Sequence, residues 1–118
     1  MNNYKELKVW QKSIDLVENV YKLCSFFPDN EKYGLVNQIQ RSAVSIPSNI
    51  AEGAGRYSNK EFRNFLSIAY GSSNELNTQL IISERLNYGK VVMIESLFKE
   101  IDEIQKMLFS LINKFSNL

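Results

Sequence analysis

The polar residues best suited to chemistry recur at three- and four-residue spacing between positions 38 and 52. On a helix, this spacing places side chains on one flank. We expect this polar stripe to satisfy backbone groups freed by Pro47 and to pair with Glu75 and Gln79 or with a neighbouring subunit. Contact with a ligand or another partner is the alternative. The polar stripe consists of Gln38, Arg41, Ser42, Ser45, Asn49 and Glu52.

A second group of side chains has the chemistry to bind RNA or DNA. Cations can hold phosphate groups, and a tyrosine ring can stack on a base. The chain has 14 Lys and Arg against 13 Asp and Glu, so no large positive field attracts nucleic acid to the whole molecule. Nucleic-acid binding would therefore depend on a local surface, and a plain solvated patch is the alternative. This basic cluster consists of Arg41, Arg56, Tyr57, Lys60 and Arg63.

Catalytic residues are not expected in this sequence. The chain has no histidine, which removes the usual general base, the Cys-His dyad and the Glu-x-x-His ligands of di-iron bundles. Spacing does not pair carboxylates such as Glu52 and Glu75 for acid and base roles. Gly53 and Gly55 lack the preceding strand and the Lys-Ser/Thr pair of a phosphate loop. We expect no enzyme activity, no metal site and no cofactor.

Four amphipathic segments must position these groups. Apolar periodicity predicts helices over residues 4–26, from about 31 to the glycines at 53 and 55, from 58 to 86, and over 94–115. Ser58 and Glu61 have the spacing of a capping box at the start of the third helix. Pro47 predicts a kink in the second helix, and Gly71 predicts a close helix neighbour beside the third.

Helices of similar length with short connections favour an antiparallel up-and-down four-helix bundle, all-α and kinked at Pro47. A chain of 118 residues has room for one domain, residues 1–118. The expected inward stripe of the first helix comprises Trp10, Ile14, Val17, Tyr21 and Cys24, widened by Leu16, Val20 and Leu23. Further apolar residues lie outside the expected inward stripes and indicate self-association. They include Val9, Val36, Ile68, Tyr70, Ile81 and Ile82.

The sequence does not suggest export or membrane insertion. The N-terminus lacks the apolar stretch of a signal peptide, and no segment approaches the roughly 20 apolar residues of a membrane helix. We therefore expect a cytoplasmic protein that does not contact a membrane. The lone Cys24 cannot form an internal disulfide, and we expect it to be buried as a small hydrophobe.

Three sequence segments resemble one known family. They are Val9-Trp10-Gln11-Lys12, the stretch from Ser45 to Gly53 (Ser-Ile-Pro-Ser-Asn-Ile-Ala-Glu-Gly), and Gly71-Ser72 followed by Glu75 to Leu80. Together they resemble the bacterial four-helix bundle family of 23S ribosomal RNA intervening-sequence proteins, over residues 7–88. The resemblance implies a four-helix bundle that assembles into a ring-like homopentamer. The family also includes accessory proteins of diversity-generating retroelements, which bind reverse transcriptase and nucleic acid.

These observations predict a non-enzymatic, homo-oligomeric helical bundle that acts as a scaffold or adaptor, with a protein partner that the sequence does not identify. The alternative is an RNA- or DNA-binding accessory protein that uses the basic cluster. Gln40 directly before Arg41 departs from the more basic pattern of the family, which weakens the transfer of nucleic-acid binding. The two roles make different predictions, because only binding to phosphate is lost steeply when salt is added.

Overall fold

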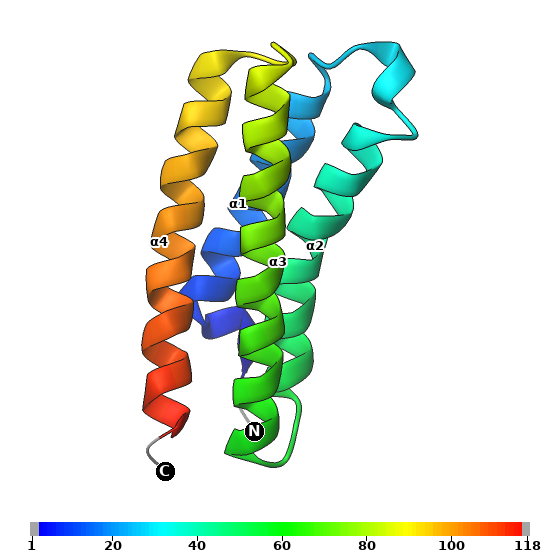
Figure 1. Ribbon diagram of the computed structural model, residues 1–118. Coiled ribbons are helices and arrows are strands. Elements are labelled where there is room, and N and C mark those ends of the chain that lie inside the picture. Colours follow the sequence, from blue (N-terminus) through cyan, green and yellow to red (C-terminus); the bar gives the residue numbers. More distant parts are fainter. Residues whose placement is uncertain (1–2, 117–118) are drawn as a thin grey trace.

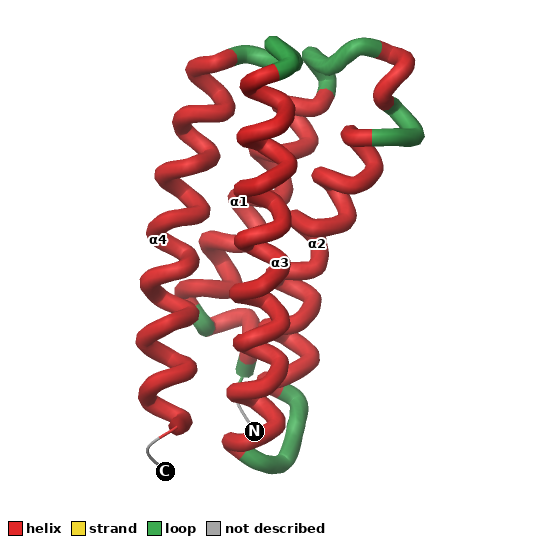
Figure 2. Tube along the Cα trace, viewed as in Figure 1, coloured by secondary structure: helices red, strands yellow, loops and turns green. Residues whose placement is uncertain are grey.

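Four long helices form the chain in the computed structural model, which describes residues 3–116 (Figure 1). They are α1 (Lys8–Cys24), α2 (Leu35–Ala54), α3 (Asn59–Arg85) and α4 (Val91–Ser116). Two short 3-10 turns precede α1 and α2, namely η1 (Tyr4–Glu6) and η2 (Asp29–Glu31). Within residues 3–116, Figure 2 shows helices and loops and no strand.

The helices pack in chain order around one core. Contacts join α1 to α2, α2 to α3, α3 to α4 and α4 back to α1, and short loops make consecutive helices antiparallel (Figure 1). The resulting bundle measures 46 × 22 × 20 Å. The predicted all-α, up-and-down four-helix bundle is therefore confirmed. None of the helices in residues 3–116 is long and apolar enough to span a bilayer.

Helix starts follow local capping chemistry. The Ser58 hydroxyl accepts a hydrogen bond from the Glu61 amide at 3.1 Å, as the capping pattern predicts. The second helix starts at Leu35, four residues later than expected, because Gly34 has non-helical backbone angles of φ −107° and ψ −108°. The Glu31 carboxylate accepts from the Leu35 amide at 3.3 Å and so caps this start from the preceding turn.

Pro47 lies inside α2 and does not end it. The helix continues from Leu35 to Ala54 on both sides of this buried residue. Proline lacks the amide hydrogen that would bond to the Ala43 carbonyl, so one helical hydrogen bond is missing here. The predicted kink at Pro47 stays a prediction.

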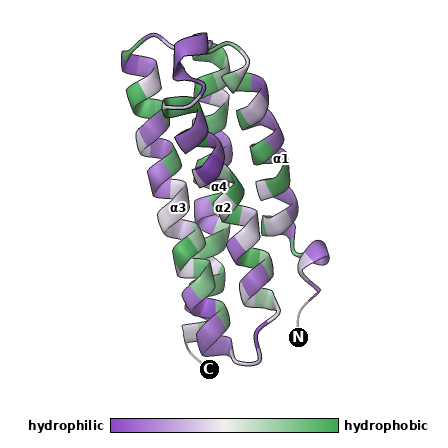
Figure 3. Cartoon of the chain, turned by 90° about the vertical axis from the view of Figure 1, so that its right-hand side faces the viewer, coloured by the Kyte–Doolittle hydropathy of each residue, from purple (hydrophilic) through white to green (hydrophobic). Residues whose placement is uncertain are grey.

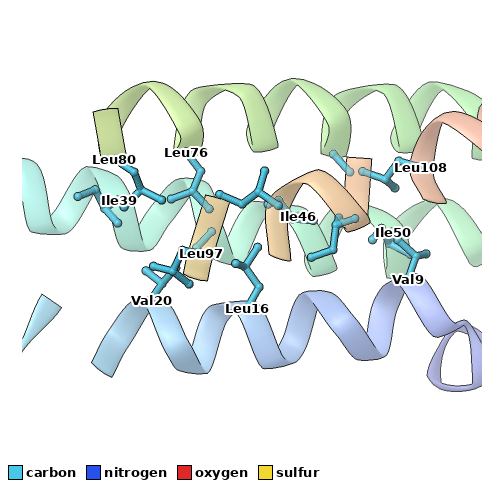
Figure 4. Close-up of a cluster of buried hydrophobic side chains, with 14 of the residues drawn as sticks. Val9, Leu16, Val20, Ile39, Ile46, Ile50, Leu76, Leu80, Leu97 and Leu108 are labelled. Carbon is cyan, nitrogen blue, oxygen red and sulfur yellow. The ribbon is translucent and has the colours of Figure 1, made fainter. Parts of the chain in front are cut away.

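Each long helix contributes fully buried side chains to the core (Figure 4). The core-facing side of α1 matches the expected stripe in part, because Leu16, Val20, Leu23 and Cys24 are buried. Val9, expected outside the core, is 1% exposed, whereas Ile14 and Tyr21 are 42% and 48% exposed. Val36 was also expected outside the core and is buried. Periodicity alone could not select the inward face of α1, because two neighbouring faces of this helix are apolar. The largest fully buried side chains include Leu16, Leu23, Ile39, Ile46, Leu66, Leu76, Ile94, Leu97 and Ile101.

The close approach between helices is made at Gly53 and not at Gly71. A Cβ atom on Gly53 would lie 2.6 Å from the Cβ of Phe65, whereas a Cβ on Gly71 would meet nothing within 4 Å. The expectation for Gly71 is therefore wrong. Gly53 allows the last turn of α2 to lie against the first turns of α3, next to the sharp turn that joins them.

Cys24 should react slowly with thiol reagents in the folded protein. Its side chain is buried, and burial raises the pKa of the thiol from 9.0 to about 11. At pH 8 the reactive thiolate is then about a hundredfold scarcer than in an exposed cysteine, and access is restricted as well. The rate at which Cys24 reacts with an aromatic disulfide, followed by absorbance, should rise at least about a hundredfold when guanidinium chloride unfolds the protein. Equal rates in native and denatured protein would contradict this burial.

Candidate functional site

An open groove between α2 and α3 collects most of the polar stripe. Its volume is about 450 Å³. We call it the polar groove. The lining side chains of α2 share one flank of that helix and form one side of the groove. Those of α3 are one turn apart and form the other side. The lining residues are Asn37, Gln38, Arg41, Ser42, Ser45, Glu75 and Gln79.

The floor of the polar groove is a buried hydrogen bond between the two helices. The Ser42 hydroxyl donates to Gln79 Oε1 at 2.7 Å, and it also lies 3.0 Å from the Ile39 carbonyl oxygen. Ser42 is 2% exposed and Gln79 is 7% exposed. A buried polar contact of this kind fixes the register of α2 against α3, because sliding either helix would leave a buried polar group without its partner.

One turn further along α2, Ser45 joins the two helices again. Its hydroxyl lies 2.8 Å from the Ser72 hydroxyl on α3. The Asn49 amide donates to the Ser45 carbonyl oxygen at 2.8 Å and to the Ser45 hydroxyl at 2.9 Å. Among residues 3–116, the side-chain donors of the polar stripe bond to the carbonyls of Ile39 and Ser45, and none bonds to the Ala43 carbonyl that Pro47 leaves free.

The rim of the polar groove carries two opposite charges that do not pair. Arg41 on α2 and Glu75 on α3 are both exposed and both line the groove. Within the described part of the chain, neither takes part in an ion pair within 4.0 Å. The guanidinium and the carboxylate therefore remain available to a bound molecule.

The structure gathers most of the basic cluster at the turn between α2 and α3. The Arg56 guanidinium forms an ion pair with Glu52 at 2.9 Å and lies 4.8 Å from the centre of the Phe65 ring. Tyr57 is 96% exposed, and Lys60 is exposed beside it at the start of α3. This end of the bundle thus presents an aromatic ring and a lysine to solvent, while Arg56 is already engaged.

Arg41 does not belong to this surface. It lies 13 residues before Ala54 on α2, so at 1.5 Å per residue it is roughly 20 Å along the helix from the turn. Arg63, by contrast, follows Lys60 by one turn on α3 and is half-buried. The basic cluster as predicted is therefore two separate features, one at the turn and one in the polar groove.

A third surface is apolar and lies on α1. We call it the apolar groove, and its volume is about 730 Å³. Tyr21 also lines an adjoining hollow with Val44 of α2, so apolar side chains continue from one helix to the next. Figure 3 views this side and shows hydrophobic segments alternating with hydrophilic ones along α1 and α2. The apolar groove is lined by Ile14, Val17, Glu18, Tyr21, Lys22 and Ser25.

Two residues of these sites were not singled out from the sequence. Asn37 lines the polar groove and precedes Arg41 by four positions, so the same helical spacing could have identified it. In the sequence, Ser72 stands out only within the Gly71-Ser72 segment of the family resemblance, and the structure adds that its hydroxyl contacts Ser45. Among residues 3–116, no cluster of three His, Cys, Asp or Glu side chains could hold a metal ion.

Comparison with known proteins gives the family. Residues 5–110 match the family of the 23S rRNA-intervening sequence protein. A crystal structure of a protein with unknown function from the S23 ribosomal protein family of Bacteroides thetaiotaomicron VPI-5482 is similar, with 32% sequence identity and a TM-score of 0.82. The alignment covers 89% of this chain and 95% of that one. No curated protein matches the chain. The chain belongs to the 23S rRNA-intervening sequence protein family.

Proposed function

We propose that this protein is a non-enzymatic scaffold or adaptor that works as a homo-oligomer. The observation that carries the proposal is the exposed apolar surface around Tyr21, which combines the apolar groove on α1 with Val44 on α2. Ile14, Tyr21 and Val44 are 42%, 48% and 39% exposed. Contiguous apolar side chains of this kind gain free energy when a second protein surface covers them.

Exposed apolar side chains also occur on α3 and α4. Ile81 of α3 and Phe109 of α4 are 45% and 58% exposed. These two residues lie on other helices than Ile14, Tyr21 and Val44 do, so contacts between copies can join unlike surfaces. A contact between unlike surfaces is heterologous. It forms a ring when the rotation that relates one copy to the next brings the last copy back to the first. This arrangement supports the ring-like homopentamer that the family resemblance implies.

The proposal is tested by light scattering on a size-exclusion column. We expect the protein to have five times the 13.7 kDa mass of its chain. Tyr21→Glu places a charge in the apolar groove and should give monomers with unchanged helix content. Tyr33→Glu is the matched control, because Tyr33 is 87% exposed and lies outside the apolar groove. A monomeric wild-type protein at micromolar concentration would overturn the proposal, as would a Tyr21→Glu pentamer.

The alternative function is RNA or DNA binding at the turn between α2 and α3. The observation that favours it is the almost completely exposed ring of Tyr57 next to Lys60. If the protein binds nucleic acid here, it should elute with nucleic acid that is detected by its absorbance and released by salt. The double variant Lys60→Ala with Tyr57→Ala should then elute without nucleic acid. An eluted protein free of nucleic acid, with no affinity for added RNA or DNA at low salt, would exclude it.

A further inference from the structure

The floor of the polar groove carries a side-chain amide nitrogen that donates to no protein group in residues 3–116. Gln79 is 93% buried and its Oε1 accepts from Ser42, yet its Nε2 makes no hydrogen bond within residues 3–116. Buried side-chain nitrogen or oxygen atoms without a partner are absent from this part of the chain, so Nε2 keeps access to solvent, and Gln79 lines the polar groove. The hydrogen bond from Ser42 holds the Gln79 amide in place, so its N–H groups are available to a molecule that enters the polar groove.

The charges on the rim restrict which molecule that could be. Arg41 provides the only full positive charge among the residues that line the polar groove, and Glu75 provides the only negative one. A phosphate or a polyanion would meet the Glu75 carboxylate, and a polyamine would meet the Arg41 guanidinium. The lining is otherwise made of amides and hydroxyls, which do not suit an apolar ligand. A molecule that carries both charges satisfies both rim residues.

We propose that the polar groove binds a small zwitterion, namely a free α-amino acid. Its carboxylate contacts the Arg41 guanidinium, whose planar fork suits a carboxylate, and its ammonium group contacts Glu75. The free amide hydrogens of Gln79 donate to the same carboxylate from the floor. The groove volume of about 450 Å³ has room for such a molecule. This site is built from α2 and α3 of one chain, and its Arg41 also lines the hollow beside Tyr21 and Val44.

The test is isothermal titration calorimetry of the full chain with each of the common α-amino acids. Each binding amino acid is compared with its N-acetyl derivative, which lacks the ammonium charge, and with its amide, which lacks the carboxylate. Both derivatives should bind at least about tenfold more weakly, as expected when a charged hydrogen bond is lost. Equal binding of the N-acetyl derivative would show a simple anion site and overturn the proposal, as would a panel without any binding.

Variants locate the site. Arg41→Gln and Glu75→Gln change exposed side chains and should keep the fold, yet each should weaken binding at least about tenfold. Glu61→Gln and Arg85→Gln are the matched controls, because they change exposed charges of α3 outside the polar groove. Light scattering on the same samples reports the oligomer separately. Unchanged affinity in both groove variants would overturn the proposal whatever the oligomeric state.

Discussion

Replacing Ile46 with alanine should lower the free energy of unfolding by about 2–5 kcal/mol. Ile46 lies on α2 with 0% exposure, and Figure 4 shows its side chain in the cluster that also contains Leu16 and Leu97. The substitution removes buried methyl and methylene groups and leaves a cavity in the core between the helices. Because neighbouring side chains come from rigid helices, they can fill that space only in part.

Urea denaturation followed by circular dichroism measures this loss. Val92→Ala is the control, because Val92 is 80% exposed and its truncation should change stability by less than about 0.5 kcal/mol. Protein concentration must be the same for all variants, since the stability of an oligomer depends on it. Similar stabilities for Ile46→Ala and Val92→Ala would contradict the position of Ile46 in the core.

Replacing Gly53 with alanine should cost about 1–3 kcal/mol. The added Cβ would lie 2.6 Å from the Cβ of Phe65, 3.0 Å from the Cδ1 of Phe62 and 3.2 Å from the Phe62 carbonyl oxygen. Two of these atoms belong to or directly adjoin the backbone, so no side-chain rotation can relieve the contact. The end of α2 and the start of α3 must separate, which weakens packing around both.

The same substitution at Gly71 should have the opposite sign. Gly71 lies inside α3, and a Cβ there would meet nothing within 4 Å. Alanine is the better helix former, so Gly71→Ala should stabilise the protein by roughly 0.5–1 kcal/mol. The midpoints of thermal and urea unfolding should therefore be lower than those of the wild type for Gly53→Ala and higher for Gly71→Ala. A stabilising effect of Gly53→Ala would show that α2 and α3 do not approach each other closely there.

The sequence alone determined the features of this protein that depend on neighbours along the chain. Helical periodicity, the turn residues and the Ser58 cap predicted four helices in the right order. These signals are local, because a cap or a helical flank involves residues within about four positions of one another. The spacing of the polar stripe also predicted that its members share one side of α2, and four of its six members now line the polar groove.

Only the tertiary structure decided which faces meet. It turned Val9 inward and left Ile14 and Tyr21 exposed, because the inward face of α1 is set by α2 and α4. It separated Arg41 from the other basic residues, because residues that are several turns apart on one helix lie far apart along its axis. It placed the close contact at Gly53, and it joined Ser45 to Ser72 across 27 positions. Such contacts depend on the rotation and register of whole helices, which packing in three dimensions fixes.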